Sequence, residues 1–468
     1  LPAQTNFIGS GIALQCSGGV GNGIDLGDVF NNLTFPFAIE AWINLQSYPD
    51  VAAGIFGTDN DLQTYSGVYL SCNPDGTVIM ELGDGMASGT QDRRGYRTTT
   101  PLPLHKWVHL AATCDSVTGM HFYFNGIDQP QTNTSGQSSS TVMLHSNAGC
   151  SIGRTMCEWG EYDLDGMLDE VRLWSVHRSE TDVRNNMCKK GDPSSPGLEG
   201  YWSADESYIS PGINDLTTPA ENGLIVGTIY KITSSAPVGN ESDYLYTSGW
   251  TGTTISIGAS TGDSLSVENI SGSPHGIQLY RVDSIPYFTV GLINYPHYYF
   301  GVFVVENDSI SHYTASYDYS FQNGIASPAN QNFLQLMKRT DNSVTYWLDA
   351  TALQDTTINQ LQKENEFSRS EYVLNSPVAT GISSISEPGI LIYPIPAAAS
   401  VIISAGNQKG KISSVHIADL GGRLLKEINN VAPTSRIYID ISDLKNGIYL
   451  IEAITASGIV WSKLDVQR

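Results

Sequence analysis

The sequence has few basic residues and no long apolar run. Lysine and arginine number 24 against 47 aspartate and glutamate residues in a chain of 468, which gives a formal net charge of −23 at pH 7. Proteins hold phosphate backbones with clustered lysine and arginine, so this balance argues against nucleic acid and against anionic membrane surfaces as partners. No apolar run approaches the ~20 residues that a membrane-spanning helix needs, and we expect no transmembrane segment.

Motifs of hydrolytic enzymes are also scarce. The sequence has no Ser/His/Asp or Cys/His set in motif form. The sharpest candidate is EYDLD, in which alternate carboxylates, Glu161 to Asp165, would share one face of a strand. Glycoside hydrolases of the jelly-roll type carry a similar motif that ends in glutamate, whereas Asp165 is one methylene shorter and begins a turn. We therefore expect a protein without enzymatic activity.

Cysteine is absent from the last three fifths of the chain. The absence of C-x-x-C pairs argues against a zinc site. The chain begins at Leu1 without methionine or a leader pattern, so we expect an N-terminus processed on export. An even number of cysteines in an exported chain favours disulfides, although spacing leaves the connectivity open. The favoured pairs are Cys150 with Cys157, Cys16 with Cys188 and, by elimination, Cys72 with Cys114.

Short alternating runs separated by turn residues dominate what is present. They predict an all-β chain of three antiparallel β-sandwich domains in series. One helix signal follows Ser179, a helix-capping residue with Asp182 at the capping-box position, and residues 359–367 read as helix-like or loop. The predicted domains are 1–205, 238–378 and 390–468, with linkers at 206–237 and 379–389.

The first domain carries four characteristic segments. They are FAIEAWINL (37–45), KWVHLAATCD (106–115), HFYFNG (121–126) and DGMLDEVRLWSVHRSETDV (165–183). In this order and spacing they resemble laminin-G-like domains of the concanavalin-A jelly-roll type. The resemblance implies two stacked sheets, with ligands bound at the loop rim or on the concave face.

The same resemblance implies candidate ligand residues. Related domains place calcium near the strand that here carries Asp169, close to Asp25, and calcium prefers carboxylate oxygens. Asp169 can instead accept hydrogen bonds from backbone amides or pair with Arg172. Sugar rings stack on exposed aromatic side chains. The aromatic residues in predicted loops are Trp159, Tyr162, Tyr65 and Tyr96.

The last stretch contains three short motifs in fixed order. LIYPIP precedes the strand SVIIS, DLGGRLL spans residues 419–425, and DISDLKNGIYLIEA spans 440–453. Together they resemble the type IX secretion sorting domain of Bacteroidetes, a small immunoglobulin-like sandwich. One departure is Ile395, where the family usually has asparagine. The motif residues are Tyr393, Pro394, Pro396, Gly421, Arg423, Gly447 and Tyr449.

These features favour a secreted or cell-surface binding or adhesion protein, exported by the type IX machinery. It would recognise a glycan or another surface through the first domain. A second hypothesis is a structural subunit that self-associates through sandwich edges into a fibre or surface layer. A jelly-roll glycoside hydrolase is the third.

Overall fold

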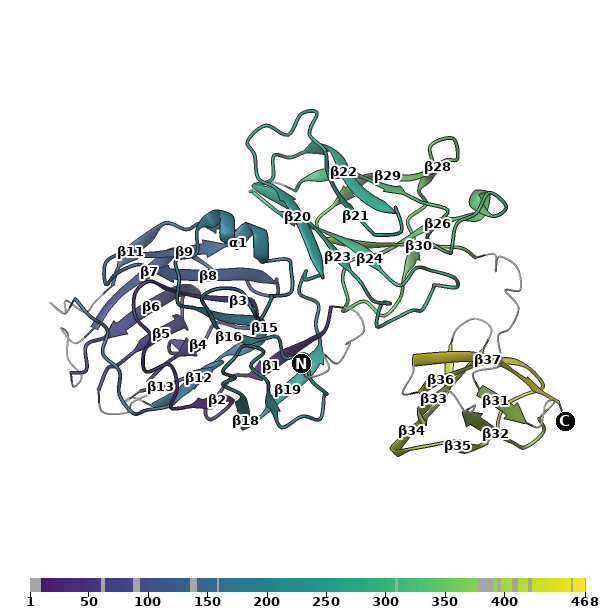
Figure 1. Cartoon of the computed structure of the whole chain (residues 1–468), viewed down its shortest axis with the longest axis horizontal. Helices are drawn as coiled ribbons and strands as arrows, with labels where there is room; N and C mark the ends of the chain where they lie inside the picture. Colours follow the sequence, from purple (N-terminus) through teal and green to yellow (C-terminus); the bar gives the residue numbers. More distant parts are fainter. Residues whose placement is uncertain are drawn as a thin grey trace. The chain divides into compact units, whose positions relative to one another are not determined.

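Nearly all the regular secondary structure of the described residues is β-strand, and the predicted all-β class is confirmed (Figure 1). The computed structural model describes residues 10–59, 64–86, 93–134, 141–157, 160–307, 310–377, 390–393, 397–405, 411–419, 423–455 and 458–467. It forms two compact units, residues 1–378 and 379–468, and each is described by itself.

The first sandwich of unit one stacks an eight-stranded sheet on a nine-stranded sheet. The eight strands are β1 (Ile12–Ser17), β3 (Phe37–Leu45), β8 (Val108–Cys114), β9 (Met120–Phe124), β10 (Ile127–Asp128), β15 (Asp165–Trp174), β16 (Leu198–Trp202) and β19 (Ile229–Thr233). Their order is β10-β9-β8-β3-β15-β1-β19, and β16 also pairs with β15.

The nine-stranded sheet encloses the core from the other side. Its strands are β2 (Gly23–Gly27), β4 (Ala53–Gly57), β5 (Val68–Cys72), β6 (Thr77–Gly83), β7 (Arg93–Pro101), β11 (Gln131–Asn133), β12 (Cys150–Ile152), β17 (Gly212–Ile213) and β18 (Gly223–Val226). Their order is β11-β7-β6-β5-β4-β12-β2-β18-β17. A separate hairpin, β13 (Arg154–Cys157) and β14 (Gly160–Asp163), follows β12.

The predicted linker at 206–237 is wrong. Strands β17 and β18 extend the nine-stranded sheet, and β19 pairs with β1 at the edge of the other sheet. Ile213 and Ile229 of this segment are buried in the core of the first sandwich. The segment is rich in turn residues because its strands are short.

The predicted helix is present as α1 (Glu180–Asn186). The Ser179 hydroxyl accepts a hydrogen bond from the Asp182 amide, and the Asp182 carboxylate accepts one from the Ser179 amide. This capping box satisfies donors that the first helical turn would otherwise leave open.

The second sandwich also belongs to unit one. Its six-stranded sheet contains β20 (Glu241–Leu245), β23 (Gly276–Val282), β24 (Tyr299–Val305), β30 (Ser370–Asn375), β26 (Gln335–Arg339) and β27 (Leu348–Asp349), in that order. Its five-stranded sheet contains β21 (Ile255–Gly258), β22 (Ser264–Ser271), β25 (His312–Asp318), β29 (Gln360–Phe367) and β28 (Leu353–Asp355), in that order. A 3-10 turn, η1 (Gln331–Phe333), precedes β26. Residues 359–367, expected as helix or loop, instead form β29, because β25 and β28 supply backbone partners on both sides.

The two sandwiches share a buried seam. Trp42 and Trp107 on the outer face of the eight-stranded sheet pack in one cluster with Tyr280, Tyr299 and Phe303 of the six-stranded sheet. The rings of Trp42 and Phe303 meet edge to face at 5.4 Å, an arrangement that aromatic pairs favour. The outer face of the eight-stranded sheet is therefore covered by the second sandwich.

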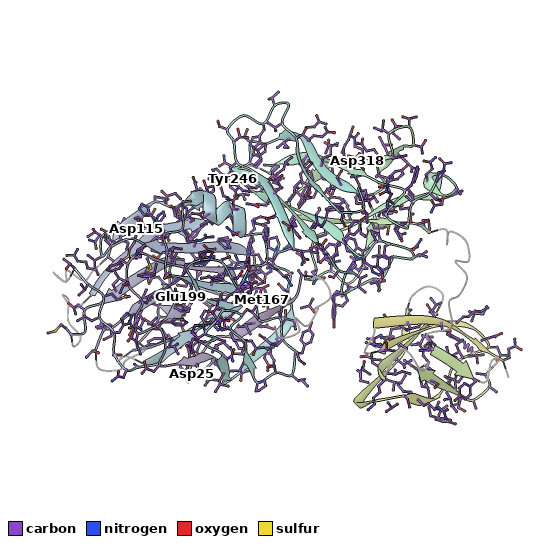
Figure 2. All side chains as sticks on the ribbon, viewed as in Figure 1. Asp25, Asp115, Met167, Glu199, Tyr246 and Asp318 are labelled. Carbon is purple, nitrogen blue, oxygen red and sulfur yellow. The ribbon has the colours of Figure 1, made fainter. Side chains whose placement is uncertain are left out.

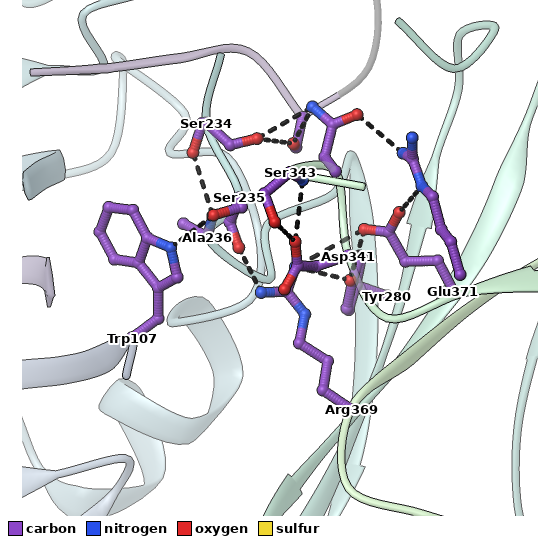
Figure 3. Close-up of polar contacts among 12 residues, drawn as sticks. Trp107, Ser234, Ser235, Ala236, Tyr280, Asp341, Ser343, Arg369 and Glu371 are labelled. Atoms are coloured by element: carbon purple, nitrogen blue, oxygen red, sulfur yellow. Dashed lines mark hydrogen bonds and ion pairs between the residues drawn. The ribbon is translucent and has the colours of Figure 1, made fainter. Parts of the chain in front are cut away.

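A polar network completes the seam around the connecting segment Ser234–Ala236 (Figure 3). The Ser234 carbonyl accepts hydrogen bonds from the Asn342 amide at 2.9 Å and the Ser10 hydroxyl at 3.0 Å. The Ser235 carbonyl accepts from Arg369, and the Ser235 hydroxyl accepts from the Trp107 indole at 2.8 Å. The network joins groups far apart in the sequence, so the two sandwiches act as one body.

Unit two is a small sandwich of its own. A three-stranded sheet contains β31 (Ile390–Tyr393), β32 (Ser400–Ala405) and β35 (Arg436–Asp440), in that order. The second sheet contains β34 (Leu424–Thr434), β33 (Ile412–Asp419), β36 (Gly447–Thr455) and β37 (Gly458–Val466), in that order. Its core draws only on residues of this unit, among them Val401, Ile417 and Ile451.

Candidate functional site

The outer face of the nine-stranded sheet is the candidate site, because the seam covers the other outer face. The strand register places one continuous row across this face. The row runs Leu224, Asp25, Ser151, Gly57, Tyr69, Glu81 and Gly95. Directly opposite residues of an antiparallel pair point to the same face, so these side chains share one surface.

Arg154 is the most unusual side chain on this surface. Only 8% of it is exposed, and its Nη2 lies 3.8 Å from the Asp25 carboxylate, a loose ion pair. Its buried Nε has no hydrogen-bond partner among the described residues. A buried donor without a partner costs about 1–3 kcal/mol, so Arg154 holds an open donor that a ligand oxygen would satisfy.

The β13–β14 hairpin folds down onto this face at a glycine. A Cβ on Gly54 of β4 would lie 2.2 Å from the Arg154 carbonyl oxygen, so only glycine allows this approach. Tyr162 of β14 is half-buried and lies opposite Thr155. Trp159, predicted to bind a ligand, lies outside the described residues.

Two predicted stacking residues point elsewhere. Tyr65 is only 7% exposed. Tyr96 lies directly opposite Met80, which is fully buried in the core, so the Tyr96 ring faces inward. Neither presents a ring to solvent in the way that sugar stacking requires.

Arg154 and Tyr69 are residues that the sequence reasoning missed. In β5, Val68, Leu70 and Cys72 are core residues, so strand alternation places Tyr69 on the outer face. That alternation was readable in the sequence. The position of Arg154 could not be read from the sequence, because it depends on where the β13–β14 hairpin packs on the sheet.

The two predicted calcium ligands do not meet. Asp25 lies on the outer face of the nine-stranded sheet, whereas Asp169 pairs with Trp42 on the outer face of the eight-stranded sheet. Asp169 accepts a hydrogen bond from the Ser234 hydroxyl at 2.5 Å, which holds the connecting segment. Burial, with Glu170 and Asp205 nearby, raises the pKa of Asp169. Across the described ranges, no three His, Cys, Asp or Glu side chains gather as metal ligands.

Two carboxylates of the EYDLD motif, Asp163 and Asp165, hold neighbouring segments in place. Asp163 accepts hydrogen bonds from the backbone and side chain of Asn22, at 2.6 and 3.1 Å. Asp165 accepts one from the Ser47 hydroxyl at 2.5 Å. The Glu161 side chain is outside the described residues.

The structure differs from the expected disulfides. Cys16, Cys72, Cys114, Cys150 and Cys188 are each a buried free thiol, so the pairs 16–188 and 72–114 are absent, and Cys150 is unpaired. The Cys157 side chain is not described. Cys16 lies in the core between the two sheets and Cys188 lies in the seam, which explains why spacing misled. Burial raises the pKa of Cys16, Cys72 and Cys150 to about 12.

An ion pair between the partly buried His145 and the buried Asp59 anchors a loop beside the outer row. His145 Nδ1 lies 2.8 Å from an Asp59 carboxylate oxygen, and Nε2 lies 2.8 Å from the Leu33 carbonyl. Tyr69 donates to the Asp59 carbonyl, which ties the pair to the sheet face. Both ring nitrogens face acceptors, and only the imidazolium can donate from both. The bond to Asp59 raises the pKa of His145 above 6.5.

We expect this pair to make stability depend on pH. The stabilisation is complete below the unfolded histidine pKa of about 6.5 and is lost as pH rises through the raised folded pKa. Urea unfolding of the whole chain between about pH 5 and 9 should show a loss of about 1.5–3 kcal/mol that His145→Gln does not show. The same pH dependence in both proteins would contradict the assignment.

Several residues of the sorting motifs hold turns and strands of unit two in place. Arg423 donates from its amide and from Nε to the Asp419 carboxylate, at 3.0 and 3.2 Å, closing the β33–β34 turn. Asp419 lies opposite Tyr449, whose hydroxyl donates to the Lys445 carbonyl, and Gly447 begins β36. Tyr393 ends β31 and is 38% exposed. Pro394, Pro396 and Gly421 lie outside the described residues.

Two known protein families match this chain, one near each end. Residues 17–184 match a laminin-G-type family of the concanavalin A-like lectin/glucanases superfamily, and residues 391–467 match the secretion system C-terminal sorting domain. The chain carries a concanavalin A-like domain and a type IX sorting domain. The sorting domain directs this protein to the cell surface or the extracellular space. In the part of the chain that the structure covers, no helix has the length and apolar character to span a bilayer.

Solved structures offer more distant likenesses. A candidate carbohydrate-binding protein from Bacteroides ovatus is 26% identical over 50% of this chain, with a TM-score of 0.37, and the chain spans 63% of its length. A heptameric SAP-like pentraxin from Limulus polyphemus is 13% identical over 48% of this chain and 96% of its own, with a TM-score of 0.29. The sialyllactose-bound CBM40 of a Ruminococcus gnavus sialidase is 12% identical over 36% and 95%, with a TM-score of 0.28. No curated protein matches the chain.

Proposed function

We propose that this protein is an exported glycan-binding protein whose first sandwich holds a saccharide on the outer face of the nine-stranded sheet. The observation that carries the proposal is Arg154, a guanidinium with 8% exposure, a loose ion pair and an open donor on that face. A guanidinium presents several donors in a fixed plane, which suits the oxygen pairs of a sugar or a carboxylate.

The surroundings of Arg154 support a polar ligand. Asp25 and Glu81 of the outer row are partly exposed acceptors on the same face. Tyr69 lies in the same row but is only 7% exposed, and its hydroxyl donates to the Asp59 carbonyl, so it supports the sheet face and does not offer a stacking ring. Specific sites place a few polar groups precisely, and these groups fix the orientation of the ligand. The second sandwich covers the opposite face, which leaves this face and its rim for recognition.

Binding without hydrolysis is part of the proposal. A retaining glycosidase needs two carboxyl groups about 5 Å apart, one of them free to donate a proton. Asp163 and Asp165 are engaged by Asn22 and Ser47 instead.

The test is a glycan array with the full-length protein, followed by calorimetry on the strongest hit. Arg154→Gln should weaken binding tenfold or more, because hydrogen bonds to a charged group contribute about 1.5–3 kcal/mol. Arg97→Gln is the matched control, since Arg97 sits on the same sheet in an exposed pair with Asp75 at 3.6 Å. The proposal would be contradicted if no glycan on the array bound, or if Arg154→Gln and the parent protein bound the glycan with equal affinity.

A further inference from the structure

A hollow of about 390 Å³ opens at the seam between the two sandwiches. Arg184 of α1 lines it from the first sandwich, and Tyr246, Ser248, Trp250, Ser273 and His275 line it from the second. Figure 2 places Tyr246 at this seam, and Asp25 on the other side of the first sandwich. The hollow is therefore separate from the face that carries Arg154.

The walls of the hollow are fixed from both sides. The Tyr246 hydroxyl donates to the Asn125 carbonyl at 2.8 Å, and Gln278 Nε2 donates to the Arg184 carbonyl at 3.0 Å. The Arg184 guanidinium carbon lies 4.0 Å from the centre of the Tyr246 ring. A Cβ on Gly126, whose φ is +72°, would lie 2.7 Å from Arg184 Cγ, so glycine permits this contact. A preformed site avoids the cost of ordering its walls when a ligand binds.

The hollow has no uncompensated charge in its lining. Arg184 donates from Nη2 to the Glu180 carboxylate and from Nε to the Gly126 carbonyl at 2.9 Å. The other lining groups named above are hydroxyls, an imidazole and two aromatic rings. An anion would have to compete with Glu180 for Arg184, so a neutral ligand fits better.

The lining suits a molecule with many hydroxyl groups. Ser248 and Ser273 bring hydroxyls that both donate and accept. Trp250 is only 5% exposed and belongs to the core of the second sandwich, and the Arg184 guanidinium covers the Tyr246 ring, so the hollow presents mainly polar groups. The volume falls within the ~300–1,000 Å³ of small-molecule sites. We propose that the seam hollow is a second binding site, for a short neutral saccharide. This inference does not depend on the site at Arg154.

The test fills the hollow. Ser248 is exposed, so Ser248→Trp places an indole there without disturbing the core. Ser260→Trp is the matched control, because Ser260 is an exposed serine in the loop at the other end of β21. Saturation-transfer NMR of the full chain uses glucose, galactose, mannose, N-acetylglucosamine and glucuronic acid as probes.

At least one neutral probe should receive saturation from the parent protein, from Ser260→Trp and from Arg154→Gln. The same signal should fall about fivefold or more in Ser248→Trp. Three results would overturn the inference: no transfer to any neutral probe, transfer to glucuronic acid alone, or an unchanged signal in Ser248→Trp. Because Arg154→Gln is measured beside it, failure of one site is distinguishable from failure of the other.

Discussion

Replacing Glu371 with alanine is expected to lower the free energy of unfolding by about 3–5 kcal/mol, as removal of one partner from a buried ion pair does. Glu371 Oε2 lies 2.7 Å from Arg339 Nε, and both side chains are fully buried. Its other oxygen accepts from the Tyr280 hydroxyl at 2.9 Å and lies 3.5 Å from Arg369. The variant would leave two guanidinium groups in the seam without their carboxylate.

Urea unfolding followed by tryptophan fluorescence measures this loss, because Trp42, Trp107 and Trp347 all pack in the seam cluster. Lys189→Ala is the control, since the Lys189 and Glu241 side chains also cross the seam, at 2.9 Å, but are 39% and 50% exposed. That change should cost less than about 1 kcal/mol. If Glu371→Ala folds too poorly to titrate, Glu371→Gln keeps the shape and the hydrogen-bond acceptor. Similar losses for position 371 and Lys189→Ala would contradict the account of the seam.

Deleting residues 390–468 is expected to abolish delivery to the cell surface while leaving unit one folded. The sorting domain is the part of the chain that the type IX machinery reads. Unit two has a core of its own, and among the residues that the structure describes, the cores of both sandwiches in unit one draw on none beyond 378.

The measurement is the amount of protein outside the cell and in the periplasm of a host with a type IX system. The full-length chain in the same host and in one without the system provides the controls. The melting temperature of purified residues 1–378 should match the unit-one transition of the full chain. Surface delivery of the truncated chain would refute the role of the sorting domain. A lowered melting temperature would refute the independence of unit one.

Local patterns were predictable from the sequence. The capping box of Ser179 and Asp182 depends on two residues three positions apart, so it was readable before the fold was known. Alternation in segments such as Arg436–Asp440 indicated the sandwich class, because period-two patterning reflects one buried face. The sorting motifs were readable for the same reason, since each is a short contiguous run of residues.

Contacts between distant segments were harder to predict. Residues 359–367 are polar enough to pass for a helix or loop, yet pairing with β25 and β28 makes them a strand. The turn-rich segment 206–237 passed for a linker because β17, β18 and β19 are short strands whose partners lie far away in the sequence. Tyr96 was predicted to be an aromatic residue in a loop, but it lies opposite Met80 in the sheet, so its ring faces the core.

By itself, the sequence determined the all-β class, the concanavalin A-like and sorting domains, and the export of the protein, because these depend on short-range periodicity and motifs. Only the tertiary structure decided that two sandwiches form one body, that Asp25 and Asp169 face opposite ways, and that Arg154 is buried with an open donor. Those properties arise where strands distant in sequence pack together. The long-range register that sets them leaves no local signal in the chain.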